Sequence, residues 1–134
     1  MSVWGIGAYY DKDLSEEFIL RNCACIGWSK GEAPALYKMF TSVKIGDIIY
    51  IKAFLPKKRQ LLIKSVGIVT ENAIRNISSE LGMGLSVKWK RLNDPVEINI
   101  TEQIYKNNVF NNTLYEEYNV SIIQTIISLL LENN

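Results

Sequence analysis

The chain has 134 residues, an apolar fraction of 48% and a net charge of +1. This length suits a single domain over residues 1–134, which can bury a core without a disulfide or a metal to stabilise it. The sequence contains no histidine and no glycine-rich nucleotide motif, so it lacks the commonest general base, the common catalytic triads and the usual phosphate-binding loop.

We expect neither export nor membrane insertion from this sequence. Residues 1–4 lack the basic and apolar regions of a signal peptide, and the apolar run at 122–131 is too short to span a bilayer. Cys23 and Cys25 are separated by one residue, a spacing that rarely allows disulfide geometry. We therefore expect two free thiols, a reducing cytoplasmic location and no membrane partner.

Positive charge is concentrated in the middle of the chain. Residues 1–29 carry a net charge of −2, residues 30–91 carry +8 and residues 92–134 carry −5. This pattern could present a positive face to an anionic polymer such as nucleic acid. The lysines could instead keep exposed strand edges soluble, and from charge alone we prefer this second interpretation.

The first forty residues predict a strand and two helices. Residues 2–8 form a short strand, whose glycines indicate the close approach of another backbone or of a ligand. A helix follows over residues 13–22, because an aspartate or a serine can cap it and two glutamates lie in its first turn. Residues 23–32 are predicted as a loop that carries Trp28, and residues 33–40 as a second helix with a proline in its first turn.

A β-hairpin organises the middle of the chain. Gly46 and Asp47 form its entry turn, and the β-branched segments 48–54 and 61–71 form its strands. The reversal at 55–60 contains a proline, which cannot donate a ladder hydrogen bond and so belongs outside the central strands.

The remaining chain is predicted to extend the sheet and to end in a helix. Apolar and polar side chains alternate in the segment LSVKWKRL, which is typical of a strand. We expect, in order, a polar connection with one helical turn (72–84), a strand (85–92), a turn (93–95), a further strand (96–100) and a closing helix (120–131). The polar, asparagine-rich residues 101–118 are left open between strand and loop.

Two sets of residues that could bind a metal are better explained by structural roles. Cys23 and Cys25 lack the spacing of zinc ligands and a second ligand pair. Asp47 and Glu71 could be imagined as metal carboxylates of a nuclease, but Asp47 suits a turn and Glu71 the end of a strand. We therefore expect no metal, no cofactor and no catalysis.

Six segments occur in an order that matches a known pattern: VWGIGAYY, CACIGW, VKIGDIIYIKAF, SVGIVTE, SVKWKRL and NDPVEI. Together they resemble the EVE domain of the PUA-like superfamily, the related YTH domains and the similar modules of modification-dependent restriction systems. The resemblance covers most of residues 3–131. It implies an α+β fold, a mixed β pseudo-barrel of about six strands flanked by about three helices.

The resemblance also implies a function without catalysis. Such modules bind DNA or RNA and recognise one modified base, which is flipped out of the nucleic acid into an aromatic pocket. Extruding a base costs a few kcal/mol, and stacking on aromatic side chains returns about 1–3 kcal/mol per base. A partner nuclease or ATPase would supply any further activity.

On this sequence, the resemblance places the base pocket at the end of the first strand and in the tryptophan loop. Its candidate residues are Gly7, Ala8, Tyr9, Tyr10, Cys25, Ile26, Gly27 and Trp28. Trp28 would stack the base together with one of Tyr9 and Tyr10. Only one of these tyrosines is expected to line the pocket, because neighbouring strand residues face opposite sides. The second cage tryptophan of YTH-type domains has no counterpart here, where Leu81 or Met83 would have to serve, which argues against a methyladenine reader.

Basic residues would hold the nucleic-acid backbone without reading its sequence. The phosphate-binding candidates are Lys57, Lys58, Arg59, Lys88, Lys90 and Arg91. Trp4 and Trp89 are predicted to lie in the core. The competing hypothesis is a protein-interaction or assembly module that keeps this fold without a functional base pocket, and its mark would be a pocket filled by the protein's own side chains.

Overall fold

The protein is built on one mixed sheet. The computed structural model describes residues 1–101, 110 and 112–132. The strands are β1 (Val3–Gly7), β2 (Cys23–Cys25), β3 (Ile48–Leu55), β4 (Gln60–Ser78), β5 (Gly82–Asn99) and β6 (Leu114–Glu116). They lie in the order β2-β5-β4-β3-β1-β6, and β1 runs parallel to β3 whereas all other neighbours are antiparallel.

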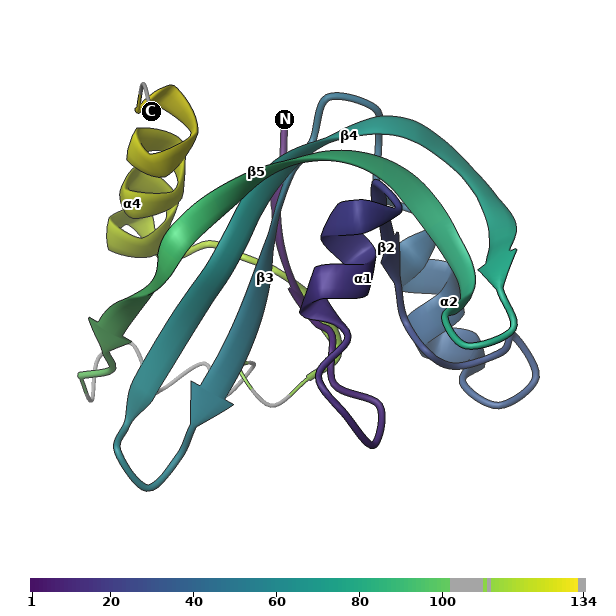
Figure 1. Cartoon of the computed structure of the whole chain (residues 1–134), viewed down its shortest axis with the longest axis horizontal. Coiled ribbons are helices and arrows are strands. Elements are labelled where there is room, and N and C mark those ends of the chain that lie inside the picture. The colour runs from purple at the N-terminus through teal and green to yellow at the C-terminus, as the bar shows by residue number, and fades with distance from the viewer. Residues whose placement is uncertain (102–109, 111, 133–134) are drawn as a thin grey trace.

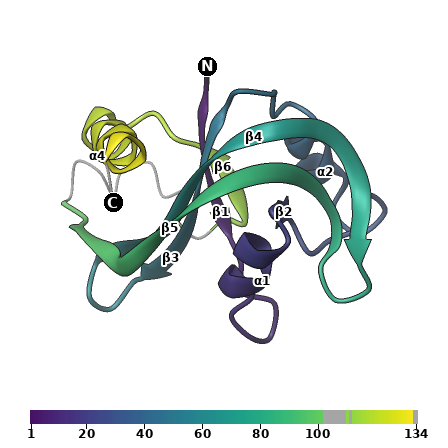
Figure 2. The ribbon, with the colours of Figure 1, turned by 45° about the horizontal axis from the view of Figure 1, so that its top comes forward.

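The sheet curls into a half-barrel with helices on both of its faces. The helices are α1 (Ser15–Leu20), α2 (Pro34–Phe40) and α4 (Val120–Leu131). The long strands β4 and β5 arch over α1, while α4 lies at the other end of these strands (Figures 1 and 2). The predicted α+β class is confirmed, with six strands and three helices among the described residues.

Each face of the sheet is covered by its own hydrophobic core, which explains the unbroken apolar run in β3. Ile49 belongs to the core that contains Phe18 of α1. The next residue, Tyr50, belongs to the core that contains Ile126 of α4. A strand that is buried on both faces shows no alternation of polar and apolar residues.

The connection predicted at residues 72–84 is wrong, because β4 and β5 continue there as one long ribbon. Their pairing extends until Ser78 lies opposite Gly82. Glu71 lies inside β4 rather than at its end, and the register shifts beside it. Its Oε1 accepts hydrogen bonds from the next two backbone N–H groups, at 3.0 and 3.1 Å. The polar side chain of Glu71 therefore accepts the backbone hydrogen bonds that a β-bulge leaves unpaired, and it does not mark a loop.

The chain does not reverse direction at residues 93–95, where a turn was predicted. Ser65 pairs with Arg91 and Ile63 pairs with Val96, so β5 continues along β4 on both sides of these residues. The intervening residues of β5 bulge out of the ladder, where a proline can be accommodated because no N–H is required.

The hairpin begins at the predicted entry turn. The carboxylate of Asp47 accepts hydrogen bonds from the backbone N–H groups of Ser2 and Lys44 and from the indole N–H of Trp4, at 3.0, 2.9 and 2.9 Å. These bonds tie the start of β3 to the start of β1. Asp47 is therefore a turn residue, as predicted.

The helices follow the predicted order, and one predicted loop contains a strand. Asp13 accepts a hydrogen bond from the backbone N–H of Ser15 at the start of α1 (2.9 Å), and the closing helix spans the predicted residues. Residues 23–25 form the edge strand β2, which pairs with β5. Residues 102–109 lie outside the described residues, so part of the segment left open is not covered. No helix in the described ranges is long and apolar enough to cross a membrane.

Candidate functional site

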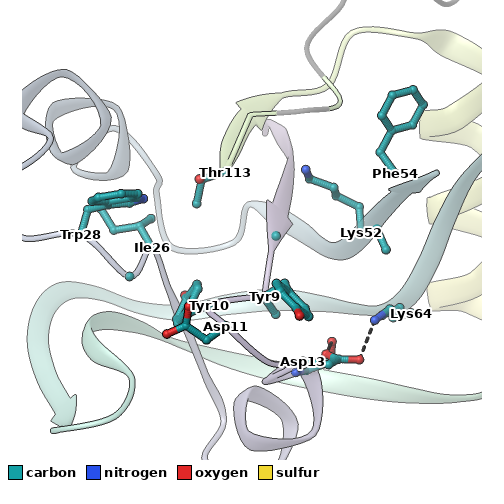
Figure 3. A pocket seen from close by; sticks show the side chains of 15 residues that line it. Tyr9, Tyr10, Asp11, Asp13, Ile26, Trp28, Lys52, Phe54, Lys64 and Thr113 are labelled. Carbon is teal, nitrogen blue, oxygen red and sulfur yellow. Dashed lines mark hydrogen bonds and ion pairs between the residues drawn. The ribbon is translucent and has the colours of Figure 1, made fainter. Parts of the chain in front are cut away.

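A hollow of about 590 Å³ opens where β1 ends (Figure 3). Most of its lining comes from three parts of the chain: the end of β1 with the turn that follows it, the loop after β2, and the last part of β3. Lys64 of β4 and Thr113, just before β6, complete it. The lining residues are Gly7, Ala8, Tyr9, Tyr10, Asp11, Asp13, Ser15, Ile26, Gly27, Trp28, Lys52, Ala53, Phe54, Lys64 and Thr113. All of the base-pocket candidates except Cys25 belong to this set.

The chain leaves β1 in a tight reversal that directs both tyrosines to the hollow. Gly7 ends the strand, and Tyr9 forms an isolated bridge with Asp13. Asp11 takes the positive φ of 76° that this reversal requires. The expectation that only one of Tyr9 and Tyr10 could line a pocket is wrong, because these residues lie in a turn where strand alternation no longer applies.

Tyr10 forms a fixed wall of the hollow. Its hydroxyl donates a hydrogen bond to the carbonyl oxygen of Cys25 at 2.5 Å, and its ring lies 6.2 Å from that of Phe18. A Cβ on Gly27 would approach the Tyr10 ring to 2.9 Å, and Gly27 has a φ of 74°, so both space and backbone require glycine there. Burial raises the pKa of the Tyr10 hydroxyl, which keeps it a hydrogen-bond donor.

Trp28 and Tyr9 present open ring surface. The side chains are 50% and 72% exposed, although both line the hollow. The turn after Trp28 is fixed by two reciprocal hydrogen bonds between Ser29 and Glu32, at 3.0 and 3.2 Å. Exposed aromatic rings beside a hollow are available for stacking on a planar ligand.

Lys52 is a lining residue that the sequence analysis missed. Only 9% of the surface of Lys52 is exposed, and its Nζ donates a hydrogen bond to the carbonyl oxygen of Phe110 at 2.6 Å. The Nζ also lies 5.7 Å from the centre of the Tyr115 ring. Burial lowers the pKa of Lys52 to about 8. The available signal was a single lysine inside the apolar segment IIYIKAF.

The rim of the hollow carries an ion pair. Lys64 Nζ lies 2.7 Å from a carboxylate oxygen of Asp13, whose other oxygen accepts hydrogen bonds from Ser15 (Figure 3). Burial would raise the pKa of Asp13, but the hydrogen bonds from Lys64 and Ser15 outweigh this and hold the pKa below its ordinary value. Asp13 is therefore ionised and neutralises Lys64.

Cys25 lies behind the hollow rather than in its lining. Cys23 and Cys25 are free thiols that are fully buried on one face of β2. Their mutual hydrogen bond lowers the pKa of Cys23, and the same bond together with burial raises the pKa of Cys25. The contribution of Cys25 to the site is its carbonyl oxygen, which holds Tyr10.

The basic candidates do not form one continuous surface. Lys57, Lys58 and Arg59 lie in the turn between β3 and β4, and Lys88 is exposed on β5. Exposed lysines such as Lys57, Lys58 and Lys88 can contact phosphates.

The side chains of the two remaining basic candidates form hydrogen bonds with other parts of the protein. Lys90 donates hydrogen bonds to the carbonyl oxygens of Leu129 (2.6 Å) and Glu132 at the end of α4. Arg91 makes two hydrogen bonds to the carboxylate of Glu16 in α1, at 2.6 and 2.7 Å. Because α1 and α4 contribute to different cores, Lys90 and Arg91 reach opposite sides of the sheet.

The other two tryptophans lie in the predicted core environment. Trp4 is buried and donates its indole N–H to Asp47. Trp89 is partly buried and donates its indole N–H to the carbonyl oxygen of Cys23 at 2.8 Å. Among the described residues, no cluster of cysteine and carboxylate side chains is arranged to hold a metal ion.

Fold and site together define a small α+β half-barrel with an aromatic-lined hollow at the end of its first strand. The structure is similar to the NMR structure of Rpa0253 from Rhodopseudomonas palustris, with a TM-score of 0.59 and 8% sequence identity over 99% of this chain and 97% of that one. At this identity the similarity shows the fold alone. The sequence matches no protein-family model and no curated protein.

Proposed function

We propose that this chain is a non-catalytic nucleic-acid-binding module of the EVE type, which holds one flipped, modified base of DNA or RNA in the hollow at the end of β1. The observation that carries the proposal is the meeting of Tyr9, Tyr10 and Trp28 around one open space. The sequence resemblance places a base pocket at these residues.

The dimensions and chemistry of the hollow suit a planar ligand. Its volume of about 590 Å³ lies in the range of about 300–1,000 Å³ that is usual for small-molecule pockets. Trp28 offers a ring face for stacking, while Tyr10 is held rigidly by its bonds to the loop. Stacking on such a platform is worth about 1–3 kcal/mol per base, which is of the same order as the cost of extruding a base.

Nearby cations suit the sugar–phosphate backbone. The hollow borders the end of β3, and the next residues along the chain form the basic turn Lys57–Lys58–Arg59. A nucleic acid whose base entered the hollow could place flanking phosphates on this turn. Such contacts release counterions and make the affinity depend on salt.

The competing function is a protein-interaction module without a base pocket. Its expected mark is a hollow filled by the protein's own side chains. In the described residues the hollow is open and Trp28 is half exposed, which favours the base-binding proposal.

The test is a titration of the protein with short oligonucleotides that carry one central modified or unmodified base, followed by fluorescence anisotropy at several salt concentrations. We expect tighter, salt-sensitive binding of a modified oligonucleotide. Trp28→Ala should weaken that binding by about 1–3 kcal/mol. Tyr118→Ala is the matched control, because Tyr118 is also an exposed aromatic residue (71%) and does not line the hollow. Equal or salt-insensitive binding of all oligonucleotides, or no binding, would refute the proposal.

A further inference from the structure

Lys52 is a buried cation on the wall of the hollow. Figure 3 shows its side chain extending from β3 toward the end of β1 and Thr113. A Cβ on Gly7 would lie 3.7 Å from both Cε and Nζ of Lys52, so the ammonium group sits beside the backbone that borders the hollow. A base that reaches this wall of the hollow would lie next to the ammonium group.

The charge of Lys52 is matched by no carboxylate among the residues that the structure describes. The ion pairs there join Lys12 to Glu80, Arg21 to Glu17, Lys64 to Asp13 and Arg91 to Glu16. Lys52 instead donates to the carbonyl oxygen of Phe110. An ammonium group has three N–H donors, and a buried cation gains free energy when acceptors replace the lost water.

The other titratable groups of the hollow do not compete for this role. They are Tyr9, Tyr10, Asp11, Asp13 and Lys64 in the lining, with Tyr115 beneath the ammonium group. Asp13 is already paired with Lys64, and Tyr10 donates to the loop. Lys52 is thus the buried donor next to the space that a base would fill.

We propose that Lys52 determines which base the hollow accepts, favouring bases that present two neighbouring acceptor atoms, as guanine and cytosine do, over adenine. Guanine presents O6 beside N7, whereas adenine places an N6 amino donor beside N7. On the Watson–Crick edge, cytosine presents O2 beside N3, whereas the adenine amino group lies beside N1. An ammonium group that faces either of these two edges of adenine would meet this donor, and a buried donor without an acceptor is costly. The inference rests on the proposed function and names the ligand class of the same site.

The test uses oligonucleotides in which a single base stands among baseless sugar residues, so that the flanks supply phosphates alone. The central position carries guanine, cytosine, 5-methylcytosine, adenine, N6-methyladenine or no base. Binding is measured for the wild-type protein, for Lys52→Met and for the control Lys44→Met, which makes the same substitution at an exposed lysine away from the hollow. Thermal unfolding checks that each variant is folded.

We expect the wild-type protein and Lys44→Met to prefer the guanine or cytosine series over the adenine series by about tenfold, and Lys52→Met to lose this preference while keeping base-dependent binding. The preference should also decline as the pH rises through about 8, where Lys52 loses its charge. Equal or tighter binding of the adenine series by the wild-type protein, or an unchanged preference in Lys52→Met, would overturn the inference and leave the base-binding function intact. Binding that does not depend on a base at all would overturn both proposals.

Discussion

Two groups of aromatic residues lie close to β1. In one group the side chains are buried and bonded to each other, and in the other they are exposed. The first, the closed cluster, consists of Tyr50 and Tyr115 together with Glu117: the two tyrosine hydroxyls lie 2.7 Å apart and Tyr50 donates to Glu117 at 2.6 Å. In the open pair, Tyr9 and Trp28, the side chains are mostly or half exposed beside a hollow.

The difference indicates which aromatic residues serve the fold and which serve a ligand. The closed cluster is so tightly filled that a Cβ on Gly5 would lie 2.5 Å from the Tyr115 ring. Its residues therefore stabilise the folded state through burial and internal hydrogen bonds. The open pair leaves half or more of its surface uncovered, so its rings can be covered by a ligand instead.

The largest expected effect contrasts one tyrosine from each group. Tyr50→Ala should lower the free energy of unfolding by about 3–5 kcal/mol, because it empties a buried site and removes the hydroxyl that donates to Oε1 of Glu117. Tyr9→Ala should change that free energy by less than about 0.5 kcal/mol, since Tyr9 is exposed. Urea denaturation of both variants measures the difference, and similar losses would contradict the distinction between the two groups.

The same comparison holds for two aspartates. Asp47→Asn should cost about 1–3 kcal/mol of stability, because an amide cannot accept all three of the hydrogen bonds that the buried carboxylate accepts. Asp13→Asn should cost less than about 1 kcal/mol, since its pair with Lys64 is partly exposed. Thermal or chemical denaturation near neutral pH compares the variants.

The pH dependence of stability gives a second readout for Asp47. Burial would raise the pKa of Asp47, but hydrogen bonds from Ser2, Lys44 and Trp4 outweigh it and hold the pKa below its ordinary value of 3.8. The stabilisation is therefore complete above this ordinary value and is lost as the pH falls below it. Asp47→Asn should flatten the acid limb of the stability profile, and an unchanged acid limb would show that Asp47 does not contribute to it.

The smallest expected effects separate the lysines that the fold uses from those that it leaves exposed. Lys90→Ala should cost about 0.3–1 kcal/mol of stability, because Lys90 holds the carbonyl end of α4, and it should leave oligonucleotide binding unchanged. Lys58→Ala should leave stability unchanged and reduce the salt dependence of binding by about one unit of slope. A reversed assignment of these effects would place the phosphate surface on β5 instead of the β3–β4 turn.

Elements that depend on local interactions were predictable from the sequence, whereas those that depend on long-range pairing were not. The hairpin and the closing helix were predictable, because turn residues and periodicity are local signals. The hollow brings together residues 7–10 and 26–28, which the sequence linked only through the family resemblance. The long β4–β5 ribbon was not predictable, because the polar residues around Glu71 satisfy a bulge whose existence depends on pairing with a distant strand.

The place of Lys52 in the hollow was hidden for a similar reason. A lysine within an apolar strand is usually an edge or surface residue, and only the packing of Tyr115 and Phe110 against β3 buries it. Lys90 and Arg91 show the converse, since they look like free surface cations in the sequence and are engaged by α4 and α1 in the structure.

The indole N–H signals of the three tryptophans give the most direct test that the open ring surface binds a base. Trp4 and Trp89 donate their N–H groups inside the protein, whereas Trp28 is half exposed at the hollow. In a two-dimensional NMR titration with an oligonucleotide that carries a modified base, the Trp28 signal should shift or broaden while those of Trp4 and Trp89 stay in place. Binding of the oligonucleotide that leaves the Trp28 signal unmoved would contradict the account.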